Sequence, residues 1–170
     1  MRCLPLLMAS LLCFACQDGD DSRSGPIHRA HSDGVSFAAL EGWSIERDRD
    51  AWVQVGQDDA SHTTIAVRSV RRNGWSEDRT PELVLPATQT SLGALPGSKV
   101  SGPEHFEHPE YRADVFRLTF QPRSKLGRYE RHHVVLFSEN RVFHVLHTGP
   151  QGSLEHSHKQ FEKVVKSVRE

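Results

Sequence analysis

Histidine is the most prominent residue type in this chain of 170 residues whose side chain could take part in catalysis or metal binding. Eleven histidines are present, and most occur in pairs separated by one to three positions. Neutral imidazole is a common metal ligand, and it is the side chain that titrates nearest to neutral pH. On a β-strand, adjacent residues and residues three apart point to opposite faces. The pairs His132/His133 and His144/His147 therefore cannot chelate a metal within one strand.

The segment from Tyr129 to Thr148 predicts an antiparallel hairpin with a two-residue turn at Glu139-Asn140. Val, Leu and Phe flank the polar turn and favour strands, and Asn adopts a positive φ at low cost. Both faces of the hairpin are apolar, which predicts a central place in a sheet that is covered on both sides. The register pairs Phe137 with Val142, Val135 with His144, His133 with Leu146 and His132 with His147.

This register makes His132 and His147 a candidate metal site across the hairpin. Directly opposite residues have Cβ atoms about 5 Å apart, which can bring two imidazoles to one ion. Glu130 shares a face with His132 and could add an oxygen ligand, and His158 of the final helix could add a nitrogen. Two interpretations stay open. One is a site for zinc or another divalent transition metal, and the other is a set of half-buried neutral rings.

Motifs of the common enzyme classes are missing from the sequence. It has no G-x-S-x-G nucleophile elbow, no phosphate-cradling glycine loop and no H-E-x-x-H motif. These absences favour a non-catalytic protein, with an unrecognised hydrolase as the less favoured alternative.

Trp75 lies in a polar loop beside Arg71 and Arg72. An aromatic residue flanked by arginine is a usual composition for a partner contact. A tryptophan folded back to anchor the loop is the alternative. These three residues are therefore candidates for contact with a protein partner in the cell envelope.

The first 15 residues have the pattern of an export signal. Arg2 precedes an apolar run of 11 residues, Leu4 to Phe14, which is too short to span a bilayer. Leu12-Cys13-Phe14-Ala15-Cys16 resembles the lipobox of bacterial lipoproteins. The resemblance implies cleavage before Cys16 and a diacylglyceryl thioether on that residue, and Gln17 after it favours the periplasmic face of the outer membrane. The alternative is an ordinary signal peptide.

Residues 16–34 are rich in Asp, Ser and Gly and predict a disordered tether behind the lipidated cysteine. Loss of residues 1–15 removes Arg2, which leaves 20 of the 21 basic residues against 22 acidic residues. This slightly acidic balance does not favour nucleic acid as a partner.

Residues 35–170 predict one α+β domain. We expect strands within 35–47, 51–55, 63–70, 99–107 and 111–121. Because an interior proline costs about 3 kcal/mol, we expect only a short turn at 81–85 and a helix from Pro86 to about Leu95. The domain should end in an amphipathic helix, Leu154 to Val168, with Ser153 as its cap.

This order of elements resembles the PsbP-like superfamily, which includes photosystem PsbP proteins and small bacterial lipoproteins. The matching motifs are Phe37-x-x-x-x-Gly42-Trp43-x-Ile45 and Phe161-x-x-Val164-x-x-Ser167-Val168. The resemblance implies an αβα sandwich around a mainly antiparallel sheet, and it implies no reaction. The sequence therefore favours a lipid-anchored envelope protein that acts as a binding or assembly module, and the alternative is a histidine-based metal-binding or metal-sensing protein.

Overall fold

The computed structural model describes residues 26–30, 34–56, 62–72 and 79–170. Its helices are α1 (Pro81–Gly93), the 3-10 helix η2 (Leu154–Ser157) and α2 (His158–Ser167). Its strands are β1 (Ile27–Ala30), β2 (Val35–Ala38), β3 (Trp43–Asp48), β4 (Ala51–Gly56), β5 (Thr64–Arg71), β6 (Lys99–His105), β7 (Arg112–Phe120), β8 (Tyr129–Phe137) and β9 (Arg141–Pro150).

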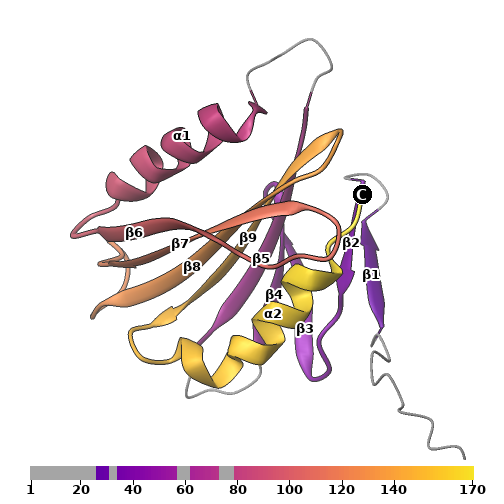
Figure 1. Ribbon diagram of the computed structural model, residues 1–170. Coiled ribbons are helices and arrows are strands. Elements are labelled where there is room, and N and C mark those ends of the chain that lie inside the picture. The colour runs from indigo at the N-terminus through magenta and orange to yellow at the C-terminus, as the bar shows by residue number, and fades with distance from the viewer. Residues whose placement is uncertain (1–25, 31–33, 57–61, 73–78) are drawn as a thin grey trace, which may run out of the picture.

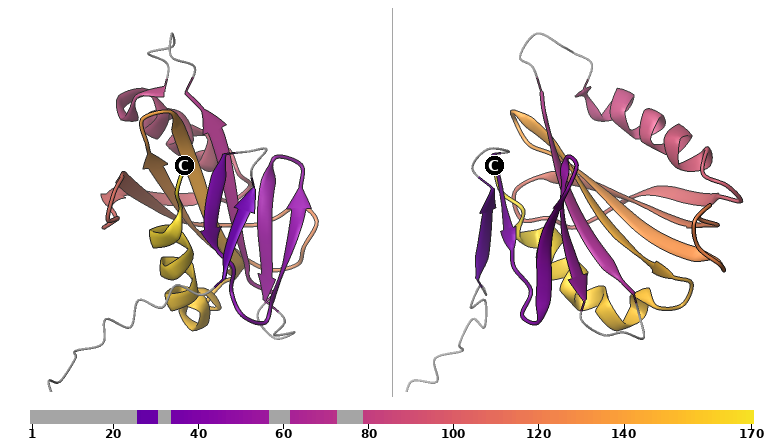
Figure 2. Two further views of the ribbon diagram at one scale, coloured as in Figure 1. Left: turned by 90° about the vertical axis from the view of Figure 1, so that its right-hand side faces the viewer. Right: turned by 180° about the vertical axis from the view of Figure 1, so that it is seen from behind.

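Seven of these strands form one antiparallel sheet in the order β3-β4-β5-β9-β8-β7-β6. The helix α1 lies on one face of this sheet and α2 lies on the other, as Figure 1 shows and the rear view of Figure 2 confirms. Strands β1 and β2 form a separate two-stranded sheet. The predicted αβα sandwich around an antiparallel sheet is confirmed.

The predicted hairpin lies at the centre of the sheet, with β9 in the fourth position and β8 beside it. Its register is the predicted one, since Phe137 pairs with Val142 and His132 pairs with His147. A two-residue turn between alternating strands fixes this register, because a slip by one residue would exchange the two faces.

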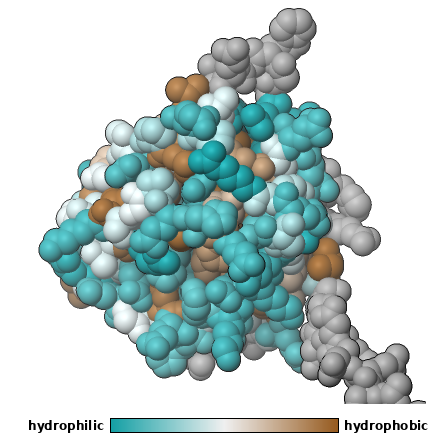
Figure 3. Space-filling view, in the orientation of Figure 1, coloured by the Kyte–Doolittle hydropathy of each residue, from teal (hydrophilic) through white to brown (hydrophobic). Residues whose placement is uncertain are grey.

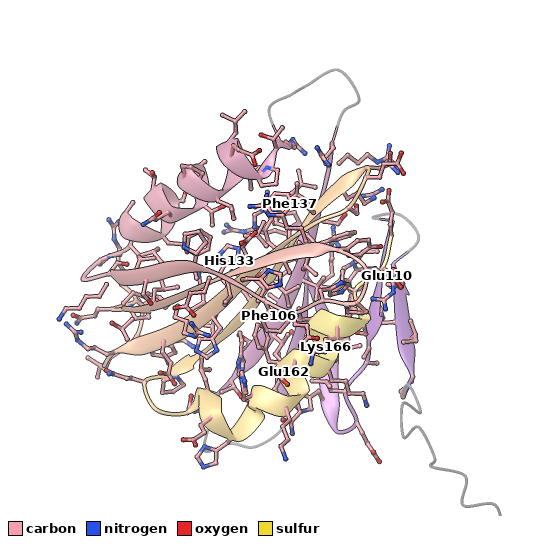
Figure 4. The ribbon with its side chains drawn as sticks, viewed as in Figure 1. Phe106, Glu110, His133, Phe137, Glu162 and Lys166 are labelled. Atoms are coloured by element: carbon pink, nitrogen blue, oxygen red, sulfur yellow. The ribbon has the colours of Figure 1, made fainter. Side chains whose placement is uncertain are left out.

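Each face of the hairpin belongs to a different apolar core. On the α2 side, Leu136 and Phe143 are fully buried in a cluster with Phe161 of α2. On the α1 side, Phe137 and Val142 pack with Leu85 of α1. Figure 4 places Phe137 near α1 and Phe106 near α2. The sheet therefore separates the domain into two compartments with different side chains.

Strand β1 lies inside the segment that we predicted to be a tether. Ile27 pairs with Ala38, and the ladder continues as far as Ala30 opposite Val35. The His28 ring packs against Phe37 and Trp52, with ring centroids 5.0 and 4.5 Å away. Residues Ile27–Ala30 are therefore ordered, because pairing and ring contacts compensate for their low apolar content.

The helix α1 is continuous from Pro81 to Gly93, so the predicted break before Pro86 is wrong. Pro86 cannot donate a hydrogen bond to the carbonyl of Glu82. Both residues are exposed, so that carbonyl can be satisfied by solvent. The helix therefore tolerates a proline that a buried helix would not.

The final helical segment differs from the prediction at its start. Residues Leu154–Ser157 form the 3-10 helix η2, and the α-helix begins at His158. Ser153 makes no side-chain cap, because its hydroxyl donates to the carbonyl of Pro150 at 2.7 Å. The predicted apolar stripe is present, since Phe161, Val164 and Val165 are all buried.

The face of the molecule in Figure 3 is mainly hydrophilic, and its hydrophobic residues show between polar ones. Within the described ranges, no helix is both long enough and apolar enough to cross a membrane.

Candidate functional site

The structure brings together three of the histidines predicted as metal ligands. The ring of His132, on β8, lies 6.1 Å from that of His147, on β9, and 6.0 Å from that of His158, at the start of α2. All three rings surround Phe161, which stacks on His147 at 4.9 Å between centroids. Hairpin register and the position of α2 together create this cluster.

His147 is completely buried and uncharged at neutral pH. Its Nε2 lies 2.7 Å from the hydroxyl of Ser157 in a buried hydrogen bond. Burial, and then the nearby His132 and His158, lower its pKa from 6.5 to about 3. One ring nitrogen is thus engaged by the protein, and the other, Nδ1, is buried and has no hydrogen-bond partner among the described residues.

Glu130, the predicted oxygen ligand, caps the start of η2 in the structure. Its Oε1 accepts hydrogen bonds from the backbone N–H groups of Gly152 and Leu154, at 2.9 and 3.0 Å. Leu154 is the first residue of η2 and Gly152 lies in the turn before it. The first N–H groups of a helix have no partner within the helix. Over the residues that the structure describes, no group of three or more His, Cys, Asp or Glu side chains is arranged to hold a metal ion.

A second site, which we call the α1-side pocket, lies on the opposite face of the sheet. It is a cavity of about 410 Å³ between α1 and the strands β5, β8 and β9. Figure 4 shows His133 beneath α1. The lining residues are Arg68, Val70, Arg79, Leu83, Val84, Ala87, Thr88, Ser91, Leu92, His133, Val142 and His144.

A hydrogen-bonded pair of histidines forms part of this pocket. His133 Nε2 and His144 Nδ1 lie 2.9 Å apart. Burial, then His144 and Arg131, hold the pKa of His133 well below 6.5. Burial, then Arg68 and Arg79, lower the pKa of His144 to about 4, against an opposing effect of Asp50. Both rings are therefore neutral at pH 7. One of the two rings donates its N–H proton to the hydrogen bond that joins them.

The ring that donates this proton determines which of the two outer nitrogens, His133 Nδ1 or His144 Nε2, is a hydrogen-bond donor and which is an acceptor. A neutral imidazole has one donor and one acceptor nitrogen. If the inner proton belongs to His133, the outer donor is on His144, and the reverse holds for the other tautomer. His133 Nδ1 is buried and has no hydrogen-bond partner in the described part of the chain. The pair can thus present either a donor or an acceptor without acquiring charge.

Two arginines give the α1-side pocket its charge. Arg68, on β5, forms an ion pair with Asp50 at 2.6 Å, and both side chains are about half exposed. Arg79, just before α1, donates from Nη1 to the carbonyl of Arg71. A guanidinium has five N–H donors, so these contacts leave donors on both side chains. The arrangement combines cations and a neutral histidine pair with an apolar wall, which suits binding of a ligand.

Sequence analysis missed the His133–His144 pair, although its register already contained the signal. That register placed Val135 opposite His144, so His133 is the diagonal neighbour of His144 on the same face. Diagonal neighbours on a sheet are within reach of long and aromatic side chains. The approach of Arg79 depends on the position of α1, for which the sequence has no comparable signal.

The residues predicted to contact a partner are only partly described. Trp75 and the lipidation candidate Cys16 lie outside the described residues. Arg72 Nη1 donates to the carbonyl of Ser138 at 2.8 Å, which ties the end of β5 to the β8–β9 turn. Arg71 ends β5 and is exposed. A partner contact by Arg71, Arg72 and Trp75 therefore stays a prediction.

No protein-family model and no curated protein matches the chain. Solved structures do match it. Cyanobacterial PsbP from Synechocystis sp. is 10% identical, with a TM-score of 0.56 over 89% of this chain and 95% of that chain. The chain has a PsbP-like fold.

Two further solved structures with a similar fold come from other bacteria. LpqN of Mycobacterium tuberculosis, a protein involved in cell envelope biogenesis, is 17% identical with a TM-score of 0.56, over 88% of each chain. A protein from Bacteroides thetaiotaomicron is 13% identical with a TM-score of 0.58 over 86% of this chain. The match covers 48% of that Bacteroides chain, so this chain corresponds to about half of it. At such identities the likeness establishes the fold alone.

Proposed function

We propose that this protein is a lipid-anchored protein of the bacterial cell envelope whose PsbP-like domain binds a small ligand without catalysis. The α1-side pocket is the observation that carries the proposal. Its volume of about 410 Å³ lies within the usual range for small-molecule sites, about 300–1000 Å³. Such sites combine apolar walls with a few placed polar groups, as this pocket does.

The envelope part of the proposal rests on different support. The lipobox-like segment ends at Cys16, and a diacylated cysteine holds a protein firmly on a membrane. The similar fold of LpqN, a protein involved in cell envelope biogenesis, agrees with this location. Gln17 favours the periplasmic face of the outer membrane. A protein partner that contacts the Trp75 loop belongs to the same proposal.

A dye-binding experiment tests the pocket directly. N-phenyl-1-naphthylamine is neutral and fluoresces strongly in apolar sites, so we expect the purified domain to bind it. Ala87 lines the pocket, and Ala87→Trp should reduce dye binding by about tenfold by filling the space. Gln89→Trp is the matched control, because Gln89 is exposed on the same helix and does not line the pocket. Equal dye binding by Ala87→Trp and wild type would exclude the pocket as the binding site.

A further inference from the structure

The α1-side pocket differs in charge from the groove on the other face of the sheet. That groove lies beside η2 and α2, and it mixes the carboxylates Glu130 and Glu155 with cations such as Arg117. The described residues that line the α1-side pocket include two arginines and no carboxylate. The pocket is therefore electropositive, although the chain as a whole carries a formal charge of −1.

The two arginines act on the same place from different walls. Arg68 pairs with His144 across the β5–β9 ladder, and Arg79 approaches from the start of α1. The fields of both guanidinium groups reach the His144 ring and oppose its protonation. A negative group placed beside His144 would thus be stabilised by both cations at once.

Asp50 offsets only part of this charge. It pairs with Arg68, but the side chains are 48% and 59% exposed, and exposed ion pairs are weak because solvent screens them. The sum over Arg68, Arg79 and Asp50 is one positive charge. Guanidinium groups also bind carboxylates through two parallel hydrogen bonds, so an incoming carboxylate can use donors that Asp50 leaves available.

Apart from the arginines, the histidine pair, Thr88 and Ser91, the lining residues are apolar, and they extend to the surface. Leu83 lies on α1, is 53% exposed and lines the pocket. Leu83 therefore extends the apolar wall outward from the charged end, and the other apolar lining residues are Val70, Val84, Ala87, Leu92 and Val142.

We infer that the α1-side pocket binds an amphipathic anion, with its carboxylate against Arg68 and Arg79 and its alkyl or aryl group along the wall formed by α1. The inference rests on the proposed function, since it names the ligand class of the same pocket. The neutral His133–His144 pair supplies one further hydrogen bond and adds no charge.

Isothermal titration with octanoate and with octan-1-ol tests the inference, because the two probes share an alkyl chain and differ in charge. We expect wild-type protein to bind octanoate at least about tenfold more tightly than octan-1-ol. The double variant Arg68→Gln/Arg79→Gln should lose this preference, and its affinity for octan-1-ol should be unchanged. Arg117→Gln, in the groove on the opposite face, is the matched control and should keep the preference.

The double variant Arg68→Lys/Arg79→Lys keeps both charges and guards against a folding defect in the glutamine variant. It should retain most of the preference for octanoate. Equal affinity for the two probes in wild type, no octanoate binding, or an octanoate affinity independent of the arginines would each overturn the inference. The dye experiment separates the two ideas, because dye binding that is lost in Ala87→Trp upholds the pocket even when the anion inference fails.

Discussion

His147 couples the stability of the domain to pH. Its pKa is 6.5 in the unfolded chain and about 3 in the folded one, so the unfolded state binds a proton more readily. The stabilisation is complete above about pH 6.5 and is lost as the pH falls toward the folded value. His147 should contribute about 1.4 kcal/mol of lost stability per pH unit in this range.

Urea unfolding at several values between about pH 7 and about pH 4.5 measures this effect. His147→Gln can keep a hydrogen bond to Ser157 but cannot titrate, so its stability should depend less steeply on pH than that of wild type, by about one proton. Part of the remaining slope should come from the other histidines whose pKa values burial lowers, which are His28, His108, His132, His133 and His144. Identical slopes in wild type and His147→Gln would show that His147 is not buried in its neutral form.

Gln54 is a second buried polar residue, and it fastens the link between β2 and β3. Its Nε2 donates to the carbonyl of Ala38 at 2.9 Å, and its Oε1 accepts from the N–H of Leu40 at 2.8 Å. Gln54→Leu should cost about 3 kcal/mol, because it leaves both backbone groups buried without partners. Gln121→Leu is the control at an exposed site. Equal midpoints of thermal unfolding for the two variants would contradict this role.

Individual residue roles were predictable where backbone geometry alone decides them. The placement of His132 directly opposite His147 follows from the turn length and the period of the strands. The capping role of Glu130 was not predictable, because its oxygen meets donors that lie 22 and 24 residues later in the chain. Charge and spacing suggested a ligand, whereas the start of η2 needed an acceptor.

At the level of elements, α2 is held mainly by its apolar stripe. Phe161 is 1% exposed and contacts Phe106 and three histidine rings. Phe161→Ala should lower the free energy of unfolding by about 3 kcal/mol or more, through lost burial and the cavity that remains. Chemical denaturation measures the loss, with Lys163→Ala at an exposed position of α2 as the control. A change below about 1 kcal/mol would mean that α2 is not packed as described.

The elements themselves were predictable to different degrees. The hairpin of β8 and β9 has a strong period and a short turn, so its register followed from the sequence. The helix α1 contradicts the local rule for proline because Pro86 is exposed. Strand β1 has few apolar residues, and its order depends on β2 and on contacts of His28 with distant rings. Such contacts have no signal within the segment itself.

At the scale of the whole molecule, membrane attachment rests on one residue in our proposal. Cys16→Ser should abolish lipidation, since the hydroxyl cannot form the thioether. The wild-type protein should partition into detergent, and the variant should appear as a water-soluble or uncleaved form. Phase separation followed by immunoblotting distinguishes them, with Cys13→Ser as the control that keeps Cys16. Processing and detergent partitioning of Cys16→Ser like wild type would refute lipid attachment at this residue.

The β1–β2 ladder has a mechanical consequence for a protein held at its N-terminal side. Ile27 pairs with Ala38, the last residue of β2. A force applied to the N-terminal side of the chain therefore acts first on the hydrogen bonds of this pair. Hydrogen bonds loaded there open one pair at a time, as in a zipper. Two backbone bonds between Ser36 and Arg169, of 2.9 and 3.0 Å, hold β2 in place.

Under tension, β1 should therefore release before the seven-stranded sheet yields. Freeing the four residues of β1 adds on the order of 13 Å to the free segment, at about 3.3 Å per residue. The longer free segment would let the domain move farther from its N-terminal attachment point without unfolding. Optical-tweezer pulling from the N-terminus should record this short extension at low force before the main rupture, and a single rupture without it would contradict the release of β1.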